Sequence, residues 1–100
     1  MARIVWTNPA LEDLSKIIDY IALDKPSAAK AYAKTVFEKI ERLESYPKSG
    51  RKLPELKRTM YLEIIVGPSR IICRNEGDDV VILHVCRGEM TIDADLISKR

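Results

Sequence analysis

Residues 60–87 read MYLEIIV-GP-SRIICR-NEGDD-VVILHVCR, and this stretch decides the fold. Its three runs are rich in Val, Ile, Leu and Tyr, and they are separated by Gly67-Pro68 and by a turn through Gly77. Short β-branched runs bounded by such turn residues are typical of strands. The stretch therefore predicts a three-stranded antiparallel meander, and the rest of the chain is expected to cover it.

The register of the meander sorts its side chains, because successive residues of a strand point to opposite faces. A two-residue loop at Gly67-Pro68 places Ile71 opposite Ile64. One face then gathers mainly apolar residues and is expected to form the core: Met60, Leu62, Ile64, Ile71, Cys73, Val81, Leu83 and Val85. The other face is expected to be mixed: Tyr61, Glu63, Ile65, Arg70, Ile72, Arg74, Val80, Ile82 and His84.

The N-terminal part of the chain predicts a strand followed by a helix. Residues 3–6 are β-branched and aromatic enough for one strand. Asn8 followed by Pro9 predicts a helix start, with Asn8 as the N-cap and Pro9 at the first helical position. Glu12 and Asp13 are expected in the first turn, where the helix dipole favours acids. Apolar residues then recur at helical spacing: Leu11, Leu14, Ile17, Ile18 and Ile21.

A second amphipathic helix is predicted after the break at Asp24-Lys25-Pro26-Ser27, and Pro47 is expected to end it. The short connection predicts an antiparallel helical hairpin that covers the aliphatic face of the sheet. Tyr20 and Tyr32 are expected in the core or at its rim, without a chemical role. The apolar positions of this helix step by four and three residues: Ala29, Ala33, Val36, Ile40 and Leu43, with Tyr32 and Phe37 beside them.

Two further segments complete the chain. Residues 47–58, PKSGRKLPELKR, are punctuated by proline and glycine and have no periodicity, which predicts a loop. Residues 91–100 predict one short helix, because Asp93 lies near its start and Arg100 at its end, as the helix dipole favours.

Length and composition predict one globular domain over residues 1–100, with 46% hydrophobic and 32% charged residues. No apolar run approaches the ~20 residues that span a bilayer, and the apolar stretch at the start is too short for a signal peptide. The expected location is the cytoplasm. Cys73 and Cys86 lack metal-ligand spacing and are accompanied by one histidine, so neither a metal nor a cofactor is expected. Their register places them beyond disulfide reach, so both thiols are expected to be reduced.

The formal net charge is +2, but five basic residues and one acidic residue lie between Lys48 and Arg58. Two interpretations of the mixed face follow. It is a solvated surface in which Glu63 pairs with Arg70 or Arg74, or it is part of a basic site for phosphate or carboxylate groups. In the second case Glu63 and His84 are chemically able to act as general base and acid. The basic site would be built from Arg51, Lys52, Arg70, Arg74 and Arg87.

The order of these segments resembles the ParE/RelE superfamily of toxins from type II toxin–antitoxin modules. The resemblance covers nearly the whole chain and implies an α+β fold of the order β-α-α-β-β-β. In that fold an N-terminal strand precedes an antiparallel helical hairpin packed on an antiparallel meander, followed by a short C-terminal helix. It rests on these motifs: IVWTNPALEDL (residues 4–14), Ile17 and Tyr20-Ile21, Pro26 with Ala28-Ala29, PKSGR (47–51), Pro54-Glu55-Leu56, RIICR (70–74) and VILHV (81–85).

The two branches of the superfamily imply different activities. RelE-like members are ribosome-dependent mRNA endonucleases with basic residues on the sheet and an aromatic residue or histidine after the last strand. Arg70 and Arg87 match their arginines, but Gly88-Glu89-Met90-Thr91 stands where such nucleases place His or Tyr. His84 lies earlier on the strand and is expected to be structural rather than a substitute acid.

ParE-like members match better, through the long hairpin, the Gly50-Arg51 loop followed by Pro54-Glu55-Leu56, and the missing nuclease residue. This resemblance implies a binding inhibitor of DNA gyrase that blocks replication, associated with plasmid stabilisation, rather than an enzyme. The residues expected to bind the target are Arg51, Lys52, Arg70, Arg74, Arg87 and Glu89, together with the tail at 89–100.

The resemblance also implies a ParD-like ribbon-helix-helix antitoxin, a toxin–antitoxin hetero-oligomer, operator DNA bound only through the antitoxin, and no membrane partner. The antitoxin would wrap the toxin along the helical hairpin and an open sheet edge. Two alternatives stay open: an mRNA endonuclease using Arg70, Arg87 and either Glu63 or His84, and a non-toxic homologue that only binds an antitoxin and regulates its operon. Expected antitoxin contacts are Leu14, Ile18, Ile21, Tyr32 and Val36.

Overall fold

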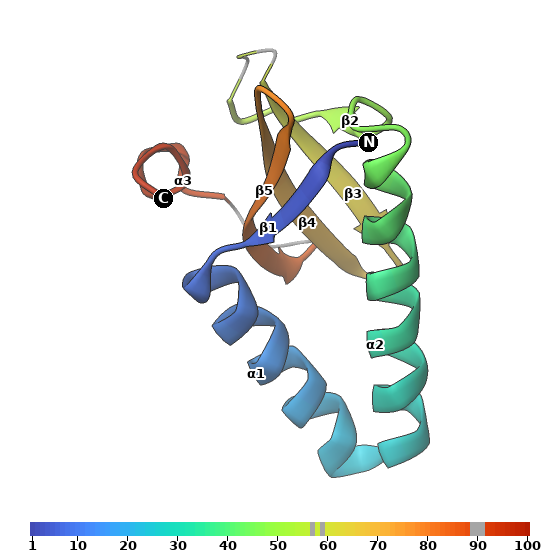
Figure 1. The fold of residues 1–100 in the computed structure, drawn as a ribbon. Coiled ribbons are helices and arrows are strands. Elements are labelled where there is room, and N and C mark those ends of the chain that lie inside the picture. The colour runs from blue at the N-terminus through green and yellow to red at the C-terminus, as the bar shows by residue number, and fades with distance from the viewer. Residues whose placement is uncertain (57, 59, 89–91) are drawn as a thin grey trace.

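The computed structural model describes residues 1–56, 58, 60–88 and 92–100 of the chain. The predicted α+β order is confirmed: a strand, a helical hairpin, a meander and a short C-terminal helix (Figure 1). Among the described residues, no helix is long and apolar enough to cross a membrane. The elements are β1 (Arg3–Trp6), α1 (Asn8–Asp24), α2 (Pro26–Glu41), the 3₁₀ helix η1 (Arg42–Glu44), β2 (Arg51–Lys52), β3 (Tyr61–Val66), β4 (Ser69–Glu76), β5 (Asp79–Arg87) and α3 (Ala94–Ser98).

The strands form one five-stranded sheet in the order β1-β5-β4-β3-β2. The meander β3-β4-β5 is antiparallel, whereas β1 pairs with β5 in parallel. The prediction of a plain loop over residues 47–58 is wrong, because β2 lies inside it and pairs Arg51 with Glu63 and Lys52 with Leu62. The short strand pairs with part of the β3 edge, whose backbone N–H and C=O groups would otherwise be exposed there.

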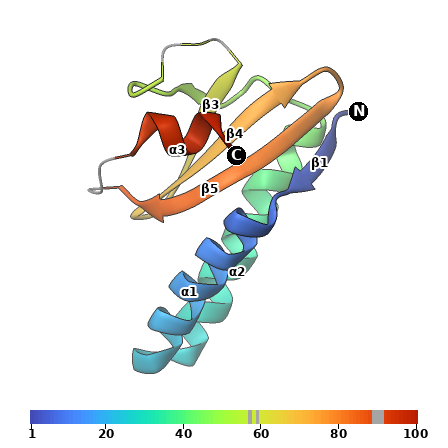
Figure 2. The ribbon, with the colours of Figure 1, turned by 90° about the vertical axis from the view of Figure 1, so that its left-hand side faces the viewer.

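The helical hairpin covers one face of the sheet with its sheet-proximal half, and its tip extends past the strands (Figures 1 and 2). Tyr20 is 71% exposed near that tip, so its expected place in the core or rim is wrong. Phe37 is 47% exposed and packs against Trp6, with ring centroids 5.5 Å apart. The buried residues on this side are Ala10, Leu14, Val36, Ile40, Leu43, Leu62, Val66, Ile71, Cys73, Val80, Ile82 and Val85.

Helix α1 begins one residue earlier than predicted. Thr7 is its N-cap, with Oγ1 accepting from the Ala10 N–H at 3.3 Å and donating to the Ile82 carbonyl at 2.8 Å. Asn8 is therefore the first helical residue rather than the cap. Glu12 and Asp13 consequently lie beyond the first turn, which contains no acidic residue.

A β-bulge in β5 overturns part of the predicted face assignment. Strands β4 and β5 pair Ile72 with His84 but Cys73 with Ile82, which leaves Leu83 as an extra residue. One extra residue exchanges the faces of everything on one side of it. Val80 and Ile82 therefore lie on the hairpin side, and Val81 and Leu83 lie on the other side, opposite to the prediction. Met60, also expected in the core, precedes β3 and is 37% exposed.

The face opposite the hairpin is a second apolar core. Helix α3 lies against it on the far side of the sheet from α2 (Figure 1), and the segment around Leu53 and Leu56 adds to the cover. The face is mixed as expected, because Glu63 and Arg70 are buried beside the apolar residues. It is not a solvated surface, however, because Ile97 of α3 packs over it. The buried residues of this second core are Leu53, Tyr61, Ile72, Val81, Leu83, Cys86, Ile92 and Ile97.

Candidate functional site

Arg70, the arginine at the centre of the sequence predictions, lies on β4 and is only 9% exposed. Its Nε donates to Glu63 Oε2 at 2.7 Å. Its two terminal nitrogens donate to the two carboxylate oxygens of Glu55, both at 2.8 Å. This planar two-point pairing is the geometry that guanidinium groups favour with carboxylates. The positive charge of Arg70 is therefore fully matched inside the protein.

Glu63 is buried between two arginines. It is 1% exposed, and its second oxygen accepts from Arg51 Nη2 at 2.7 Å. The predicted Glu63–Arg70 pair is confirmed, whereas the alternative pairing with Arg74 is not formed. Both oxygens of Glu63 already accept charge-assisted hydrogen bonds from arginines, so protonating Glu63 as a general base would weaken two buried ion pairs.

The ion-pair cluster Glu55–Arg70–Glu63–Arg51 also fastens the residues after β2 to the sheet. Hydrogen bonding to Glu55 raises the pKa of Arg70, and the same bond lowers the pKa of Glu55. Between Arg51 and Glu55, Leu53 is 2% exposed in the second core. The ion pairs of Arg51 and Glu55 therefore hold the segment that carries Leu53 against the second core.

The other predicted basic residues, Arg74, Lys52 and Arg87, lie outside this cluster. The Arg74 guanidinium lies 5.9 Å from the centre of the Tyr61 ring and donates to Glu76 at 3.0 Å. Lys52 and Arg87 are exposed at opposite edges of the meander. Glu89 lies outside the described residues. Of the predicted basic residues, the structure thus brings Arg51 and Arg70 together, and both form ion pairs with Glu63.

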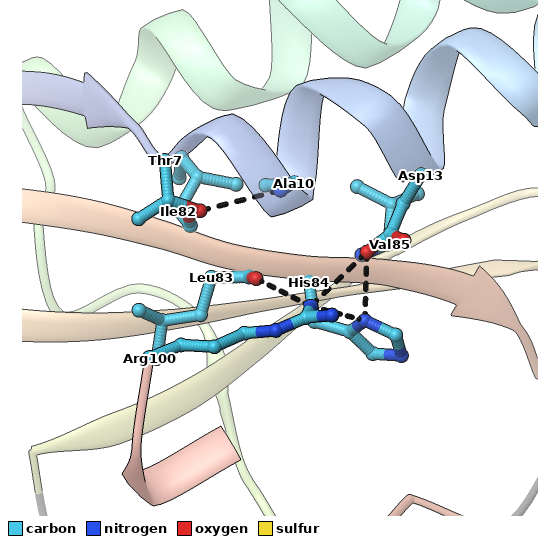
Figure 3. A network of polar contacts seen from close by, with 8 residues as sticks. All are labelled: Thr7, Ala10, Asp13, Ile82, Leu83, His84, Val85 and Arg100. Carbon is cyan, nitrogen blue, oxygen red and sulfur yellow. Dashed lines mark hydrogen bonds and ion pairs between the residues drawn. The ribbon is translucent and has the colours of Figure 1, made fainter. Parts of the chain in front are cut away.

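His84 belongs to a separate polar network with Asp13 and Arg100 (Figure 3). The Asp13 Oδ2 lies 2.7 Å from His84 Nδ1 and accepts from the Val85 N–H at 3.2 Å. Arg100 Nη1 donates to the Leu83 carbonyl at 2.9 Å and lies 3.2 Å from Asp13 Oδ2. Three distant parts of the chain therefore meet at one point on β5.

This network completes the open part of the β5 edge. Strand β1 ends at Trp6, opposite Ile82, so among the described strands none lies beside the later residues of β5 on that side. Asp13 and Arg100 supply the hydrogen bonds that a strand would otherwise make, in keeping with the rule that buried backbone groups are paired. One signal for this contact was present but unused: an acidic residue, Asp13, in the second turn of a helix that follows a strand.

Glu63 and His84 do not converge. They share a row across the sheet, because Glu63 pairs with Ile72 and Ile72 pairs with His84. With strands ~4.8 Å apart, their Cα atoms are separated by about 10 Å. The fully buried Ile72 lies between them. The proposed base and acid are therefore parted by an apolar side chain.

The thiols of Cys73 and Cys86 are both buried, which makes them poor nucleophiles. Cys73 lies in the hairpin-side core and Cys86 in the second core, on opposite faces of the sheet. Burial raises the pKa of the Cys73 thiol to about 12 and also raises that of Cys86. Both are free thiols. Among the described residues no group of three or more His, Cys, Asp or Glu side chains is placed to hold a metal.

The predicted antitoxin contacts divide by burial. Leu14 and Val36 are 3% and 0% exposed in the hairpin-side core, so a partner cannot reach them while the protein is folded. Ile18 and Ile21 are partly exposed along α1, and the half-buried Tyr32 donates to Ser69 Oγ at 2.8 Å. The residues of this set that a partner can reach are therefore Ile18, Ile21 and the exposed part of the Tyr32 side chain.

Comparison with known proteins agrees with the geometry. The family model of the ParE toxin of the type II toxin–antitoxin system parDE matches residues 4–92. The chain belongs to the ParE toxin family. The match begins in β1 and reaches past the bulged β5.

Two curated relatives of this ParE-family chain come from Caulobacter vibrioides. Toxin RelE2 is 36% identical over 87 residues, which cover 87% of this chain and 92% of the relative. Toxin ParE3 is 29% identical over 100 residues and covers 99% of both chains. Relatives named for both branches thus match over nearly their whole length, which assigns the chain to the type II toxins.

Two solved structures share the fold. A chain of the chromosomal ParDE system from P. aeruginosa matches with a TM-score of 0.73 and 24% identity, covering 89% of this chain and 98% of that one. A chain of the toxin–antitoxin complex RelBE2 from Mycobacterium tuberculosis matches with a TM-score of 0.56 and 21% identity, covering 86% and 96%. Both confirm the predicted arrangement of hairpin and sheet.

Proposed function

We propose that this protein is a ParE-like toxin that inhibits DNA gyrase by binding, and that a ParD-like antitoxin neutralises it in the cytoplasm. The observation that carries the choice of branch is the state of Arg70 and Glu63. A metal-free ribonuclease needs charged groups free to meet a phosphodiester, but here both side chains are buried and paired with each other.

The covered second face supports the same proposal. Helix α3 packs Ile97, 1% exposed, over the sheet face on which a nuclease would hold its substrate. Charges exposed to a partner lie instead around the rim, at Arg51, Lys52 and Arg87. A protein that acts by binding needs such a surface and no cleft.

An antitoxin partner is supported by membership of a type II toxin family and by the likeness to chains solved in toxin–antitoxin systems. The accessible hairpin residues Ile18 and Ile21 suit the apolar side of a partner helix. Operator DNA would be bound through the antitoxin's ribbon-helix-helix half, in a hetero-oligomer.

A gyrase assay tests the proposal. Purified protein is incubated with gyrase, ATP and relaxed plasmid, and the products are separated after protease treatment. We expect loss of supercoiling and accumulation of linear plasmid, both abolished by an excess of the antitoxin encoded beside the gene. Unchanged supercoiling with no cleaved plasmid would count against gyrase as the target.

The second candidate is a ribosome-dependent mRNA endonuclease, favoured by the 36% identity to Toxin RelE2. Its test is cleavage of mRNA on translating ribosomes by the purified protein. Cleavage that Arg87→Ala abolishes, in a variant with unchanged unfolding, would replace the gyrase proposal. Activity in neither assay, with antitoxin binding retained, would favour the non-toxic homologue.

A further inference from the structure

Two open hollows adjoin each other at the turn that leads into β2. The first has a volume of about 260 Å³ and lies between the C-terminal half of α2 and strand β3. Lys39 and Arg42 line it on the helical side, and Arg51 lines it on the side of the turn. The second hollow, of about 320 Å³, is lined by residues 46–49. Ser49 borders both, so the two hollows are neighbours on one surface.

The cations of the first hollow are available to a ligand. Within the described part of the chain, no carboxylate lies within ion-pair distance of Lys39 or Arg42. Lys39 Nζ donates to the Ile65 carbonyl at 3.2 Å, which holds the ammonium group against β3 and uses one of its three N–H donors. The carboxylate of Glu63, in the floor, is already bonded to two arginines. The first hollow therefore carries an excess of positive charge.

A backbone donor points toward the same cations. Strand β2 pairs only with residues 62 and 63, so among the described strands none lies beside residues 64–66 on the outer side. The N–H and C=O of one residue in an antiparallel strand point to the same edge. Because the Ile65 carbonyl points outward to Lys39, the Ile65 N–H points outward as well. Cations joined by a backbone N–H are the donors that bind an oxyanion.

The positive charge is confined to one flank of the helical segment. Lys39 and Arg42 are three residues apart and therefore lie on the same side. The nearby acids Glu41 and Glu44 line a different hollow, on the side of β1. The helix dipole accounts for cations near the end of a helix, but it does not account for Arg51, which reaches the first hollow from β2. The fold thus gathers cations from two elements and leaves the acids elsewhere.

Tyr46 offers a flat apolar surface beside these cations. Its side chain is 66% exposed. The turn that carries it is fixed by its own backbone, because the Tyr46 N–H donates to the Arg42 carbonyl at 3.0 Å and the Tyr46 carbonyl accepts from the Ser49 N–H at 3.1 Å. The exposed Lys48 adds another cation. Proteins bind single-stranded nucleic acid with this combination, in which a ring stacks on a base and cations contact the phosphates.

We propose that the two hollows bind a nucleic-acid strand. Lys39, Arg42 and the Ile65 N–H hold one phosphodiester group, and the neighbouring base stacks on Tyr46. A carboxylate could use the cations alone, whereas the open ring favours a ligand that carries a planar base beside its anion. DNA and RNA share this chemistry. The identification of the strand as DNA held by gyrase rests on the proposed function.

The test measures binding of a fluorescently labelled single strand of about 12 nucleotides, prepared as DNA and as RNA of the same sequence. Lys39→Gln with Arg42→Gln is the site variant. Lys16→Gln with Lys30→Gln, two exposed lysines outside the hollows, is the control with the same change in net charge.

The salt dependence of binding counts the phosphate contacts, because each contact to a single strand contributes ~0.7 to the slope of log affinity against log salt. At about 50 mM salt the site variant is expected to bind DNA at least about tenfold more weakly than wild type, with a slope smaller by about 1.4. The control is expected to stay within about twofold of wild type, with an unchanged slope.

Tyr46 supplies a second readout. Tyr46→Ala is expected to weaken binding at least about fivefold, because it removes the stacking surface. The salt slope is expected to stay the same, since the ring carries no charge. Tyr46→Phe keeps the surface and is expected to bind like wild type. Tyr20→Ala, which removes an exposed ring at the tip of the hairpin, is the control.

Four outcomes would contradict the proposal or part of it. Equal losses in the two lysine variants would overturn the site, since binding would then follow net charge alone. Failure of wild type to bind either strand would overturn it too. Tighter binding of RNA than of DNA would overturn the assignment to DNA held by gyrase. Loss of binding in Tyr46→Phe as large as in Tyr46→Ala would overturn the stacking role.

Trapping of gyrase, measured on the same variants, separates the site from the proposed function. The site variant is expected to yield less linear plasmid than the control. If wild type traps gyrase and the site variant does so equally, with unchanged binding to the strand, the site is wrong and the proposed function stands. If wild type leaves gyrase unaffected but binds DNA through the two hollows, the proposed function is wrong and the site stands.

Discussion

Replacing Arg70 by alanine tests whether this residue is structural or catalytic. It would leave Glu63, 1% exposed, with Arg51 as its one remaining ion-pair partner among the described residues. Removing one member of a buried ion pair typically costs about 3–5 kcal/mol, because the other charge stays buried and unmatched. Glu55 is 27% exposed and can recover hydration, so most of the cost arises at Glu63. A loss near 3 kcal/mol is expected, a large share of the 5–15 kcal/mol typical of small domains.

The measurement is equilibrium urea unfolding, followed by circular dichroism and by the fluorescence of Trp6. Arg74→Ala is the matched control, because Arg74 lies on the same strand but pairs with Glu76, which is 50% exposed. Such pairs contribute about 0–1 kcal/mol. A cost for Arg70→Ala no larger than for Arg74→Ala would refute the reasoning.

A double replacement sharpens the test. Arg70→Met combined with Glu63→Leu removes both buried charges and keeps the volume of the site. Exchanging a buried pair for apolar residues is often neutral or stabilising, so the double variant is expected to recover most of the stability lost by Arg70→Ala. It is also expected to retain toxicity. If Arg70 were catalytic, toxicity would be lost however stable the double variant was.

Three further outcomes follow from the same contacts. Arg100→Ala removes the bond to the Leu83 carbonyl and is expected to speed amide exchange in α3, while exchange in the hairpin stays unchanged. Gly50→Ala is expected to cost about 1–3 kcal/mol in urea unfolding, because the new Cβ would meet the Glu63 carbonyl at 3.0 Å. The lowered pKa of Glu55 means that its stabilising contribution is present above the usual glutamate range and lost as the pH falls below about 4. Stability should therefore fall more steeply between pH 5 and 2 in wild type than in Glu55→Gln, as measured by thermal unfolding.

Features specified by neighbouring residues were predicted correctly. The strands of the meander and the turns at Gly67 and Gly77 were readable because a turn needs particular residues at fixed positions; both glycines have positive φ, 54° and 58°. The hairpin was readable because apolar residues recur at helical spacing. The Glu63–Arg70 pair followed from the register that the two-residue loop imposes.

Features decided by distant contacts were predicted wrongly. The bulge at Leu83 depends on how β5 fits β4, and strict alternation in VVILHVCR conceals it. Thr7 and Asn8 can both cap a helix, and Thr7 is favoured because its hydroxyl also reaches the Ile82 carbonyl. Asp13 looked like a helix-dipole residue, but the open edge of β5 gives it a different partner, the Val85 N–H.

The position of α3 bears directly on the choice between the two activities. Opening the second face would expose at least Ile92 and Ile97, which are 5% and 1% exposed when packed. Each buried side chain of this size contributes ~1.5–3 kcal/mol, so opening costs about 3–6 kcal/mol. The open form would then be populated at roughly one part in 10²–10⁴.

Opening would still not assemble a nuclease site. Glu63 would remain bonded to Arg70 and Arg51, and Ile72 would still separate it from His84. A nuclease would therefore need binding energy from the ribosome both to displace α3 and to break a buried ion pair. A gyrase inhibitor needs neither step, since its exposed rim can bind while both cores stay closed. This difference in cost, rather than the sequence identity to either relative, favours the binding inhibitor.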